Sequence, residues 1–464
     1  MFCHAARQRG FCYVAIVRAL ISALETRMDE PTAKGLAAAI GRAVRDGVLS
    51  PGDRLPPIRD LAHELALSPT TVSAAWALLT RAGTLRTAGR RGTVVADTSA
   101  PRAGRYQQAL EHPAAFPLDL STGVPDEELL PALGDALRAL TTAGTPHSYL
   151  DDPVLPELRT ALLASWPYEP EALIVVDGAM DALELVLRPR IQYGDRVVVE
   201  HPGFPPLIDL LEALGAVVVG VSLDDEGILP SDLSAALAEP VAAVVLQPRA
   251  QNPTGISMSA ARAAALAELL ADGDVLVVED DSASALGGPP PVTLAGFLPD
   301  RTVHVRSYSK SHGPDLRLAA VSGPAPVIDA VRHLRQLGQG WSSRLLQRIL
   351  LHLLTDPESR AEVDRARATY AARRTAFVEA LAAEGVEVGG VEGLNAWVPV
   401  HDQAAALVRL ASQGIGVAAG SPFQVLPDSP HVRVTCGLVR EDLAEVAAAV
   451  AAAARTGGWG NRAR

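Results

Sequence analysis

Between about residue 119 and residue 455, short runs rich in β-branched residues alternate with Ala- and Leu-rich stretches that are typical of helices. The β-rich runs are Ile174–Val176, Arg196–Val199, Ala216–Val219, Ala242–Leu246, Val275–Val278 and Thr302–Val305. This alternation predicts an α/β domain around a mostly parallel sheet. Because ligands bind beyond the carboxyl ends of the strands in such sheets, the residues that follow these runs are the first candidates for a site.

Lysine is almost absent from this chain, which has only Lys34 and Lys310 and takes its other basic charge from arginine. An arginine guanidinium stays protonated and is a poor nucleophile, whereas a lysine amine can bond covalently to an aldehyde such as that of pyridoxal phosphate (PLP). Lys310 shares a predicted loop with Ser307 and Arg317, which suit a phosphate next to an aldehyde. Considered alone, Lys310 is explained about as well by chance survival of one lysine.

Three further segments follow predicted strands. Asp177-Gly-Ala-Met180 opens a helix, whose free N–H groups can hold a phosphate, although small residues often begin helices. Asn252, in an Asn-Pro-Thr-Gly segment, could donate to a ring oxygen or merely form a turn. Asp280, in Glu-Asp-Asp at a strand end, could keep a proton on a pyridine nitrogen or merely cap the strand.

Residues 31–96 predict a small DNA-binding module of three helices. Apolar residues at every fourth position indicate a helix from about Thr32 to Asp46, and a second helix is expected over Pro57–Ala66. Ser68 is a good N-cap and Pro69 fits the first helical position, so a third helix should run from Pro69 to about Arg81.

Two β segments, Thr84–Thr87 and Thr93–Ala96, follow the third helix and are joined by Ala88-Gly-Arg-Arg-Gly92. A helix-turn-helix followed by a basic hairpin predicts a winged helix, whose third helix enters the major groove while wing arginines meet phosphates. The alternative is a small protein-interaction domain with solvated arginines.

Charge supports this division of the chain. The net charge is −12, which argues against a surface that coats nucleic acid throughout. Residues 31–96 hold nine basic and four acidic residues, a net of +5, so the remainder carries −17. The three cysteines form no disulfide framework or metal spacing, and the scattered histidines form no metal cluster, which favours a reduced, cytoplasmic setting without a bound metal.

The first 30 residues are unusual. Phe11–Leu24 is apolar, but Arg18 interrupts it and it is too short to span a membrane. A signal peptide is conceivable because basic residues precede this segment, but we favour a mis-assigned start codon, with Met28 beginning the protein, and leave residues 1–27 out of the fold prediction. The predicted divisions are therefore 1–30, the winged helix 31–96, a linker 97–118 with a short helix near Tyr106–Glu111, the α/β domain 119–455 and a tail 456–464.

The amino-terminal motifs resemble the GntR-type winged helix. The matching segments are Val48–Ala62, Leu67-Ser-Pro-Thr-Thr-Val72 and Arg91-Gly-Thr-Val-Val95. The resemblance implies that the residues facing DNA are Arg54, Arg59, Ser68, Thr70, Thr71, Arg90, Arg91, Gly92 and Thr93.

The order of motifs in the second domain resembles the fold-type I aminotransferases. The resemblance implies that Lys310 forms a Schiff base with PLP, that Asp280 pairs with the pyridine nitrogen and that Asn252 contacts the ring hydroxyl. It further implies phosphate contacts from Ala179, Met180, Ser307 and Arg317, and ring stacking by Phe204. Arg433 would bind a substrate or effector carboxylate, and Tyr149 would reach the phosphate of a partner subunit.

One position departs from the aminotransferase pattern. Ser282 stands where these enzymes usually have a tyrosine whose hydroxyl tunes the ring, and a serine cannot reach as far. The departure leaves PLP binding intact as an expectation and weakens the case for efficient transamination.

The two halves together resemble the MocR subfamily of bacterial regulators. The resemblance implies a transcription regulator that binds double-stranded DNA as a head-to-tail homodimer and whose aminotransferase-like domain senses PLP or an amino compound. One alternative is a genuine aminotransferase with an accessory amino-terminal domain, and another is a regulator whose large domain has lost PLP.

Overall fold

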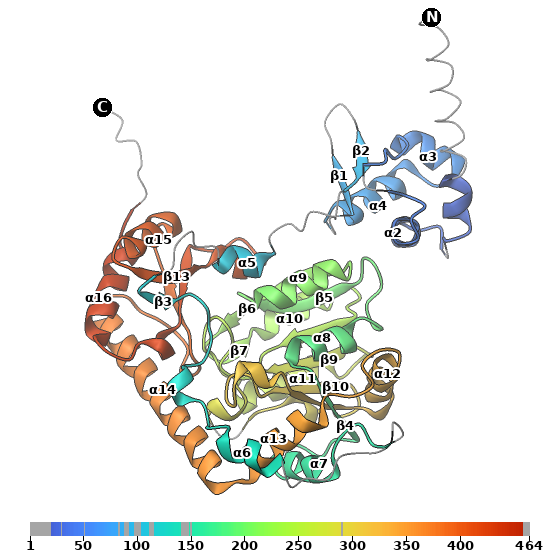
Figure 1. The fold of residues 1–464 in the computed structure, drawn as a ribbon. Coiled ribbons are helices and arrows are strands. Elements are labelled where there is room, and N and C mark those ends of the chain that lie inside the picture. The colour runs from blue at the N-terminus through green and yellow to red at the C-terminus, as the bar shows by residue number, and fades with distance from the viewer. Residues whose placement is uncertain are drawn as a thin grey trace, which may run out of the picture. The chain divides into compact units, whose positions relative to one another are not determined.

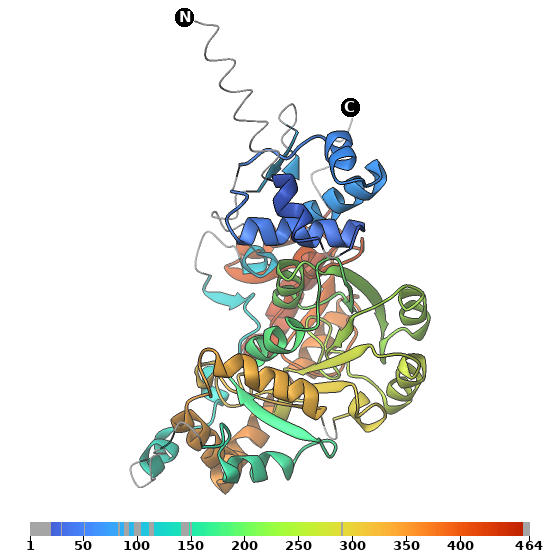
Figure 2. The same ribbon diagram turned by 90° about the vertical axis from the view of Figure 1, so that its right-hand side faces the viewer.

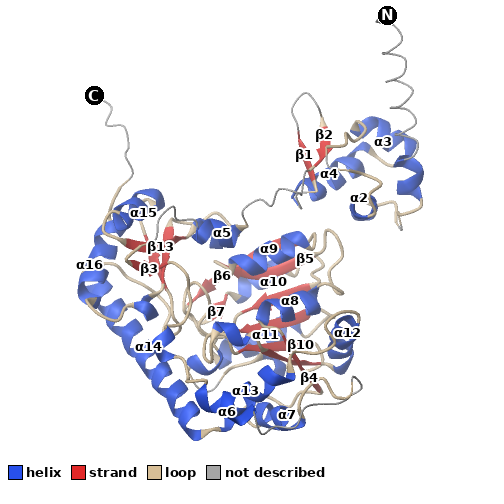
Figure 3. Cartoon of the chain, in the orientation of Figure 1, coloured by secondary structure: helices blue, strands red, loops and turns tan. Residues whose placement is uncertain are grey.

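The computed structural model describes residues 20–28, 30–50, 52–81, 84–87, 92–96, 104–110, 116–140, 148, 151–288 and 291–457. They form two compact units that divide near Gly104, and Figures 1 and 3 show the elements of each. Within these residues no helix is both long enough and apolar enough to cross a membrane.

The amino-terminal unit contains the predicted winged helix. Its elements are α2 (Ala33–Arg45), α3 (Ile58–Glu64), α4 (Pro69–Arg81), β1 (Leu85–Thr87) and β2 (Thr93–Val95). Thr32 caps α2 by accepting from the Gly35 N–H, and β1 pairs antiparallel with β2. The prediction of three helices and a hairpin is confirmed, although α3 ends two residues early because Leu65 and Ala66 leave helical geometry.

The core of this unit holds the apolar residues that the helical periodicity selected, including Leu36, Ile40, Val72 and Leu79. Three residues from the segment left out of the prediction are buried in the same core: Leu20, Ile21 and Leu24. Their spacing places them on one helical face, so this segment contributes to the module. Each such buried aliphatic side chain contributes about 1.5–3 kcal/mol.

The second unit is an α/β domain around an eight-stranded sheet with the strand order β4-β11-β10-β9-β8-β5-β6-β7. Its strands are β4 (Ala172–Val176), β5 (Arg196–His201), β6 (Val217–Asp224), β7 (Gly227–Ile228), β8 (Ala243–Leu246), β9 (Leu276–Asp281), β10 (Thr302–Ser307) and β11 (Ala319–Gly323). Strands β5, β8, β9 and β10 pair parallel, and β11 is antiparallel to both of its neighbours. The mostly parallel sheet is therefore confirmed.

Helices cover both faces of this sheet (Figures 1 and 2). The helices associated with the sheet and its edge are α6 (Gly134–Leu140), α7 (Pro156–Leu163), α8 (Ala179–Leu187), α9 (Pro205–Ala213), α10 (Pro230–Ala236), α11 (Ala260–Leu270), α12 (Ala325–Gln336) and α13 (Arg344–Thr355). Side chains of β5, β8 and β9 such as Val198, Val244 and Val277 are buried against α10 and α11. Since both sheet faces are covered, strands such as β4 and β8 are continuously apolar, whereas β9 and β10 also carry buried charged residues.

A smaller sheet with the order β12-β14-β13-β3 completes this unit. Its strands are β3 (Leu118–Leu120), β12 (Ala396–Pro399), β13 (Ile415–Ala419) and β14 (His431–Val434), and its helices are α14 (Pro357–Ala383), α15 (Gln403–Ala411) and α16 (Leu443–Ala454). The short helix predicted in the linker is α5 (Arg105–Leu110). Strand β14 places Arg433 in the interior of the unit.

Candidate functional site

The amino end of α4 carries three hydroxyl side chains at its surface. Ser68 caps the helix, because its Oγ accepts from the Thr71 N–H at 3.0 Å. The same Oγ lies 2.6 Å from Thr70 Oγ1 and 2.7 Å from Thr71 Oγ1. The structure thus brings together the three residues that the sequence predicts at base edges, at the end of the helix that enters the major groove in winged helices.

Arg54 and Arg59 are also exposed on this unit. The backbone of Arg54 forms an isolated antiparallel β-bridge with Val94 of β2. Gly92 directly precedes β2, and a Cβ atom there would lie 3.6 Å from the Arg54 guanidinium. Thr93 begins β2. The remaining predicted wing residues, Arg90 and Arg91, lie outside the described residues.

In the α/β domain, a cavity of about 390 Å³ lies at the carboxyl ends of the parallel strands. Eight of the residues predicted to bind the cofactor or effector line it: Ala179, Met180, Phe204, Asn252, Ser307, Lys310, Arg317 and Arg433. They come from segments that are far apart in the sequence: the ends of β4, β5, β8 and β10 with the turns that follow them, and, for Arg433, strand β14 of the smaller sheet. Tyr149, predicted to act on a partner subunit, lies outside the described residues.

One end of this cavity fits a phosphate. Helix α8 begins at Ala179 without a side-chain cap, so its first N–H groups are available. Gly178 has a φ of +106°, and a Cβ atom there would lie 3.2 Å from an Arg317 nitrogen, so glycine lets the guanidinium approach the helix end. With the Ser307 hydroxyl on the same wall, this end offers a cation, a hydroxyl and backbone donors.

Lys310 lies beside a buried carboxylate. Asp280 is 1% exposed at the end of β9, and its charge acts on the Lys310 amine. Burial lowers the pKa of Lys310, the Asp280 charge opposes this change and the Arg433 charge adds to it. A lysine with a lowered pKa has the neutral amine needed to attack an aldehyde.

Asn252 and Arg433 form a second polar group on the cavity wall. An Arg433 nitrogen donates to Asn252 Oδ1 at 3.3 Å, and Asn395 Nδ2 lies 3.4 Å from the same oxygen. Since Oδ1 is engaged in this way, the Asn252 amide nitrogen is the atom left for a ring hydroxyl. Gly123, with a φ of +66°, lies so close to Arg433 that a Cβ atom would be 3.2 Å from its guanidinium.

Some residues of the site were missed from the sequence. Gln247 follows β8 directly and hydrogen-bonds Asp280, and Asn395 precedes β12. The position of Gln247 after a buried strand was an available signal. Asn395 carried none, because its neighbours in the fold are distant in sequence.

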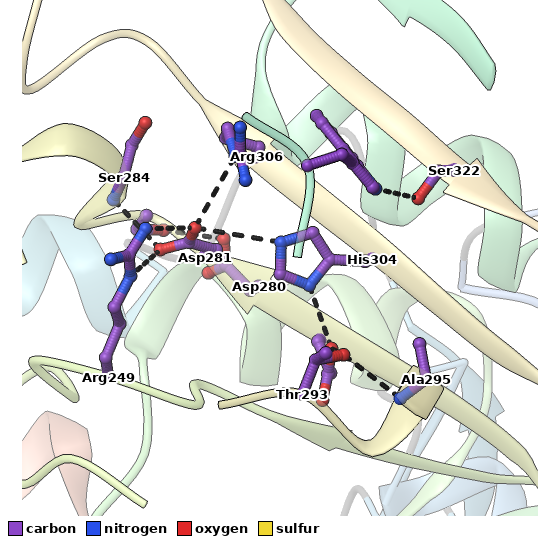
Figure 4. Close-up of polar contacts among 12 residues, drawn as sticks. Arg249, Asp280, Asp281, Ser284, Thr293, Ala295, His304, Arg306 and Ser322 are labelled. Carbon is purple, nitrogen blue, oxygen red and sulfur yellow. Dashed lines mark hydrogen bonds and ion pairs between the residues drawn. The ribbon is translucent and has the colours of Figure 1, made fainter. Parts of the chain in front are cut away.

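Asp281 faces a separate buried network that Figure 4 shows beside Asp280. Arg249 donates to both Asp281 oxygens, at 2.8 and 2.7 Å, and Arg306 lies 3.9 Å away. His304 lies between Glu279, at 2.8 Å, and Asp281, at 3.7 Å. Burial alone would raise the pKa of Asp281, but His304 and Arg249 outweigh it and hold that pKa below its usual range.

Comparisons with known proteins agree with this geometry. The profile of bacterial regulatory proteins of the gntR family matches residues 32–95, and that of aminotransferase class I and II matches residues 117–450. The vitamin B6 salvage pathway transcriptional repressor PtsJ of Salmonella typhimurium is 37% identical over 89% of this chain and 96% of its own. The pyridoxine biosynthesis transcriptional regulator PdxR of Corynebacterium glutamicum is 30% identical over 85% of this chain and 89% of its own.

Among solved structures, aspartate aminotransferase from Thermus thermophilus with maleate is 26% identical, with a TM-score of 0.64 over 73% of this chain and 92% of that one. The chain therefore belongs to the MocR-type regulators, in which a GntR winged helix precedes an aminotransferase class I and II domain. It is a DNA-binding transcriptional regulator, and PLP is the cofactor of its large domain.

Proposed function

We propose that this regulator senses PLP, or an amino compound that reacts with bound PLP, at Lys310 and changes its grip on DNA as a homodimer in the cytoplasm. The observation that carries the proposal is the cavity that gathers Lys310, a phosphate-binding helix end and Arg433 in a chain that also carries a winged helix. The names of PtsJ and PdxR concern vitamin B6, which supports PLP itself as the signal.

Different residues in and around the cavity would bind different parts of PLP. PLP supplies an aldehyde that reacts with primary amines and a ring that withdraws electrons. The start of α8, Ser307 and Arg317 would hold the phosphate, and Asn252 would contact the ring. Asp280 does not line the cavity itself but lies directly behind Gln247 and Ser282, which do, and would pair with the ring nitrogen. Phe204 lies on the cavity wall as an aromatic surface for the ring. Lys310, which is half-buried and lines the same cavity, would supply the amine that reacts with the aldehyde.

Arg433 selects a carboxylate for the amino compound. Its guanidinium is buried, lines the cavity and lies 5.0 Å from the centre of the Phe423 ring. A buried guanidinium binds a carboxylate through two parallel hydrogen bonds. An amino compound that reacts with the PLP aldehyde in this cavity would therefore be an amino acid or a related amino carboxylate.

An exposed apolar surface supports a dimer. Helix α13 packs on α6 and α7 in Figure 1. Four leucines of this region remain exposed, namely Leu133, Leu137, Leu163 and Leu345. A second copy of the chain would cover them, and large exposed apolar patches mark such interfaces. Leu345→Glu should therefore give monomers in sedimentation velocity, whereas Leu337→Glu, on a still more exposed leucine after α12, should leave the dimer intact.

The sensing half is tested by DNA binding with and without PLP. The DNA is first selected from a random library with the purified protein. An effector shifts DNA binding only through its different affinity for two arrangements of the protein. PLP should change the Kd for the selected DNA in the wild type and leave it unchanged in Lys310→Ala. An equal response of both proteins would exclude Lys310 as the sensor.

The DNA-contact half is tested on the same DNA. Thr71→Ala should change the preferred sequence, because a base contact discriminates by about 1–3 kcal/mol. Arg91→Ala should weaken binding to all sequences and reduce its salt dependence, as loss of a phosphate contact does. If both variants bind like the wild type, this face of the winged helix does not contact DNA.

Arg433 also favours a second function, a genuine aminotransferase, because a carboxylate site is what an amino-acid substrate needs. Ser282 argues against an aminotransferase, because it is a short side chain hydrogen-bonded to Asp280 at the position where these enzymes usually have a tyrosine. Steady transfer of an amino group from a donor amino acid to a keto acid, with kcat above about 1 s⁻¹, would establish this activity.

A further inference from the structure

Gln247 joins two of the residues that orient the cofactor ring. It is buried directly after β8. Its Nε2 donates to Asp280 Oδ2 at 2.7 Å, and its Oε1 accepts from the Asn252 N–H at 2.7 Å. Its own backbone N–H donates to Glu200 Oε2 at 3.1 Å. One side chain therefore sets the spacing between Asp280 and the Asn252 turn.

The orientation of the Gln247 amide follows from its partners. The Asn252 backbone N–H can only donate, so the atom that faces it must be the amide oxygen. The amide nitrogen must then face Asp280, where it can only donate. Gln247 therefore always presents a hydrogen-bond donor to this carboxylate.

Ser282 presents a second donor to the same carboxylate. Its Oγ donates to Asp280 Oδ1 at 2.6 Å, so each Asp280 oxygen receives one hydrogen bond from the protein. Each oxygen keeps a further lone pair for a pyridine N–H. The serine that departs from the aminotransferase pattern thus has a partner in this chain.

Asp280 needs these donors because its surroundings disfavour its charge. Burial raises the pKa of Asp280, and the hydrogen bonds from Ser282 and Gln247 oppose this change. The charged and titratable groups that face it are Lys310, Asp281 and Glu200. Lys310 favours the ionised form and Asp281 opposes it, while Glu200 is itself buried with a raised pKa. Without its two donors, Asp280 would therefore be protonated over more of the physiological pH range and would pair poorly with a pyridinium ring.

We propose that Gln247 and Ser282 are positioning residues that keep the Asp280 carboxylate ionised and directed at the cofactor ring, and that Gln247 also fixes the Asn252 turn beside it. This inference rests on the assignment of Asp280 to the ring nitrogen in the proposed function. It gives the serine at position 282 a role and makes Gln247 a determinant of PLP affinity.

The chain offers a matched control in Gln251. This glutamine is equally buried in the same turn, where it donates to the Pro202 carbonyl at 2.7 Å and accepts from Thr254. It has no hydrogen bond to Asp280 among the described residues. Gln251→Met therefore disturbs the turn as Gln247→Met does, without removing a donor from the carboxylate.

The experiment measures the Kd for PLP by equilibrium dialysis from pH 5 to pH 9 in the full-length protein. Binding weakens at acid pH as Asp280 takes up a proton. The midpoint of this acid limb should move upward by about one pH unit in Gln247→Met and in Ser282→Ala, since each loses one hydrogen bond to a charged group. Gln251→Met should keep the wild-type midpoint even where its overall affinity falls.

Two further variants keep the result interpretable. Gln247→Glu has the same shape but replaces the donor with a carboxylate, so it should bind PLP more weakly than Gln247→Met and provides the test if the methionine variant does not fold. Wild-type pH profiles in both Gln247 variants, or equal shifts in Gln251→Met, would overturn the inference. Asp280→Asn distinguishes a failure of this inference from a failure of the proposed function. Unchanged PLP binding in this variant would remove Asp280 from the proposed site.

Discussion

Asp280 and Asp281 are neighbours at the end of β9, 1% and 0% exposed, yet the protein treats them in opposite ways. Asp280 receives two hydrogen bonds from uncharged side chains, and burial still raises its pKa. Asp281 is paired with Arg249 and lies near His304, and its pKa is lowered. The Asp281 carboxylate is neutralised by Arg249 within the protein, whereas Asp280 receives hydrogen bonds from uncharged side chains, which suits its proposed pairing with a positively charged ring.

The difference shows how one strand end can serve stability and binding at once. The ion pair between Arg249 and Asp281 holds the turn that contains Arg249 against β9. The same turn continues to Asn252 in the cavity. Alternation of side chains along a strand puts the two carboxylates on different faces. Stability should therefore depend on Asp281, and ligand affinity on Asp280.

The largest effect expected from this comparison is on folding. Asp281→Asn should lower the free energy of unfolding by about 3–5 kcal/mol, because it leaves buried cations without their partner. Asp280→Asn should change it by less than about 1 kcal/mol, since a neutral amide replaces a carboxyl whose charge is disfavoured by burial. Urea unfolding of the PLP-free protein measures both, and equal losses would erase the distinction between the two sides.

The next effect is on the affinity for PLP, which should depend more on Asp280 than on the Asp281 network. Asp280→Asn should raise the Kd for PLP roughly 10- to 100-fold, the loss of one charged hydrogen bond. Arg249→Lys, which keeps a charge next to Asp281 but loses the double hydrogen bond, should change PLP affinity far less than stability. Dialysis at pH 7.5 provides the comparison, and a larger affinity loss in Arg249→Lys would contradict it.

Glu200 extends the comparison to a third buried carboxyl, near Asp280. Burial raises its pKa from 4.5 to about 8. In the unfolded chain this group ionises near pH 4.5, so its contribution to stability is complete below that pH and is lost as pH rises towards 8. Glu200→Gln should remove this loss and, relative to the wild type, raise the Tm at pH 8.5 by roughly 2–4 °C. If the Tm difference between Glu200→Gln and the wild type were the same at pH 5 and pH 8.5, Glu200 would not titrate in this way.

Within the Asp281 network, a smaller effect on folding is expected at Arg306, which lies at the edge of that network. It lies 3.9 Å from Asp281 and 4.2 Å from the centre of the Trp166 ring, and it donates to Ser165. Arg306→Met should cost about 1–2 kcal/mol, less than Asp281→Asn, because Arg249 still neutralises the carboxylate. The same urea assay applies, and a loss as large as that of Asp281→Asn would place Arg306 at the centre of the network.

Local signals in the sequence were enough for much of the fold. Helix α4 begins at Pro69 and ends at Arg81 as the Ser68-Pro69 signal predicts, and all six β-rich runs overlap observed strands. Strand β11, rich in Ala and Gly, and the smaller sheet were not predicted, because their pairing joins segments far apart in sequence. Hydrophobic periodicity does not carry such long-range pairings.

The site shows the same limit. Motifs placed Lys310 and Asn252 after strands and Asp280 at a strand end, and the structure shows the first two lining one cavity, since parallel strands gather their carboxyl ends on one edge. Gln247 and the partners of Asp281 escaped prediction because their roles depend on side chains some 23–33 positions away in the chain. Charged residues inside β10, such as His304 and Arg306, were the visible sign of a buried polar network.

The most direct test of the account is the near-visible absorption spectrum of the purified protein with added PLP, before and after borohydride reduction, followed by peptide mapping. We expect an absorption band that reduction abolishes, with the cofactor then attached to Lys310. Asp280→Asn should need far more PLP to give the same band. No band in the wild type, or label on residues other than Lys310, would contradict the assignment of this cavity as the sensing site.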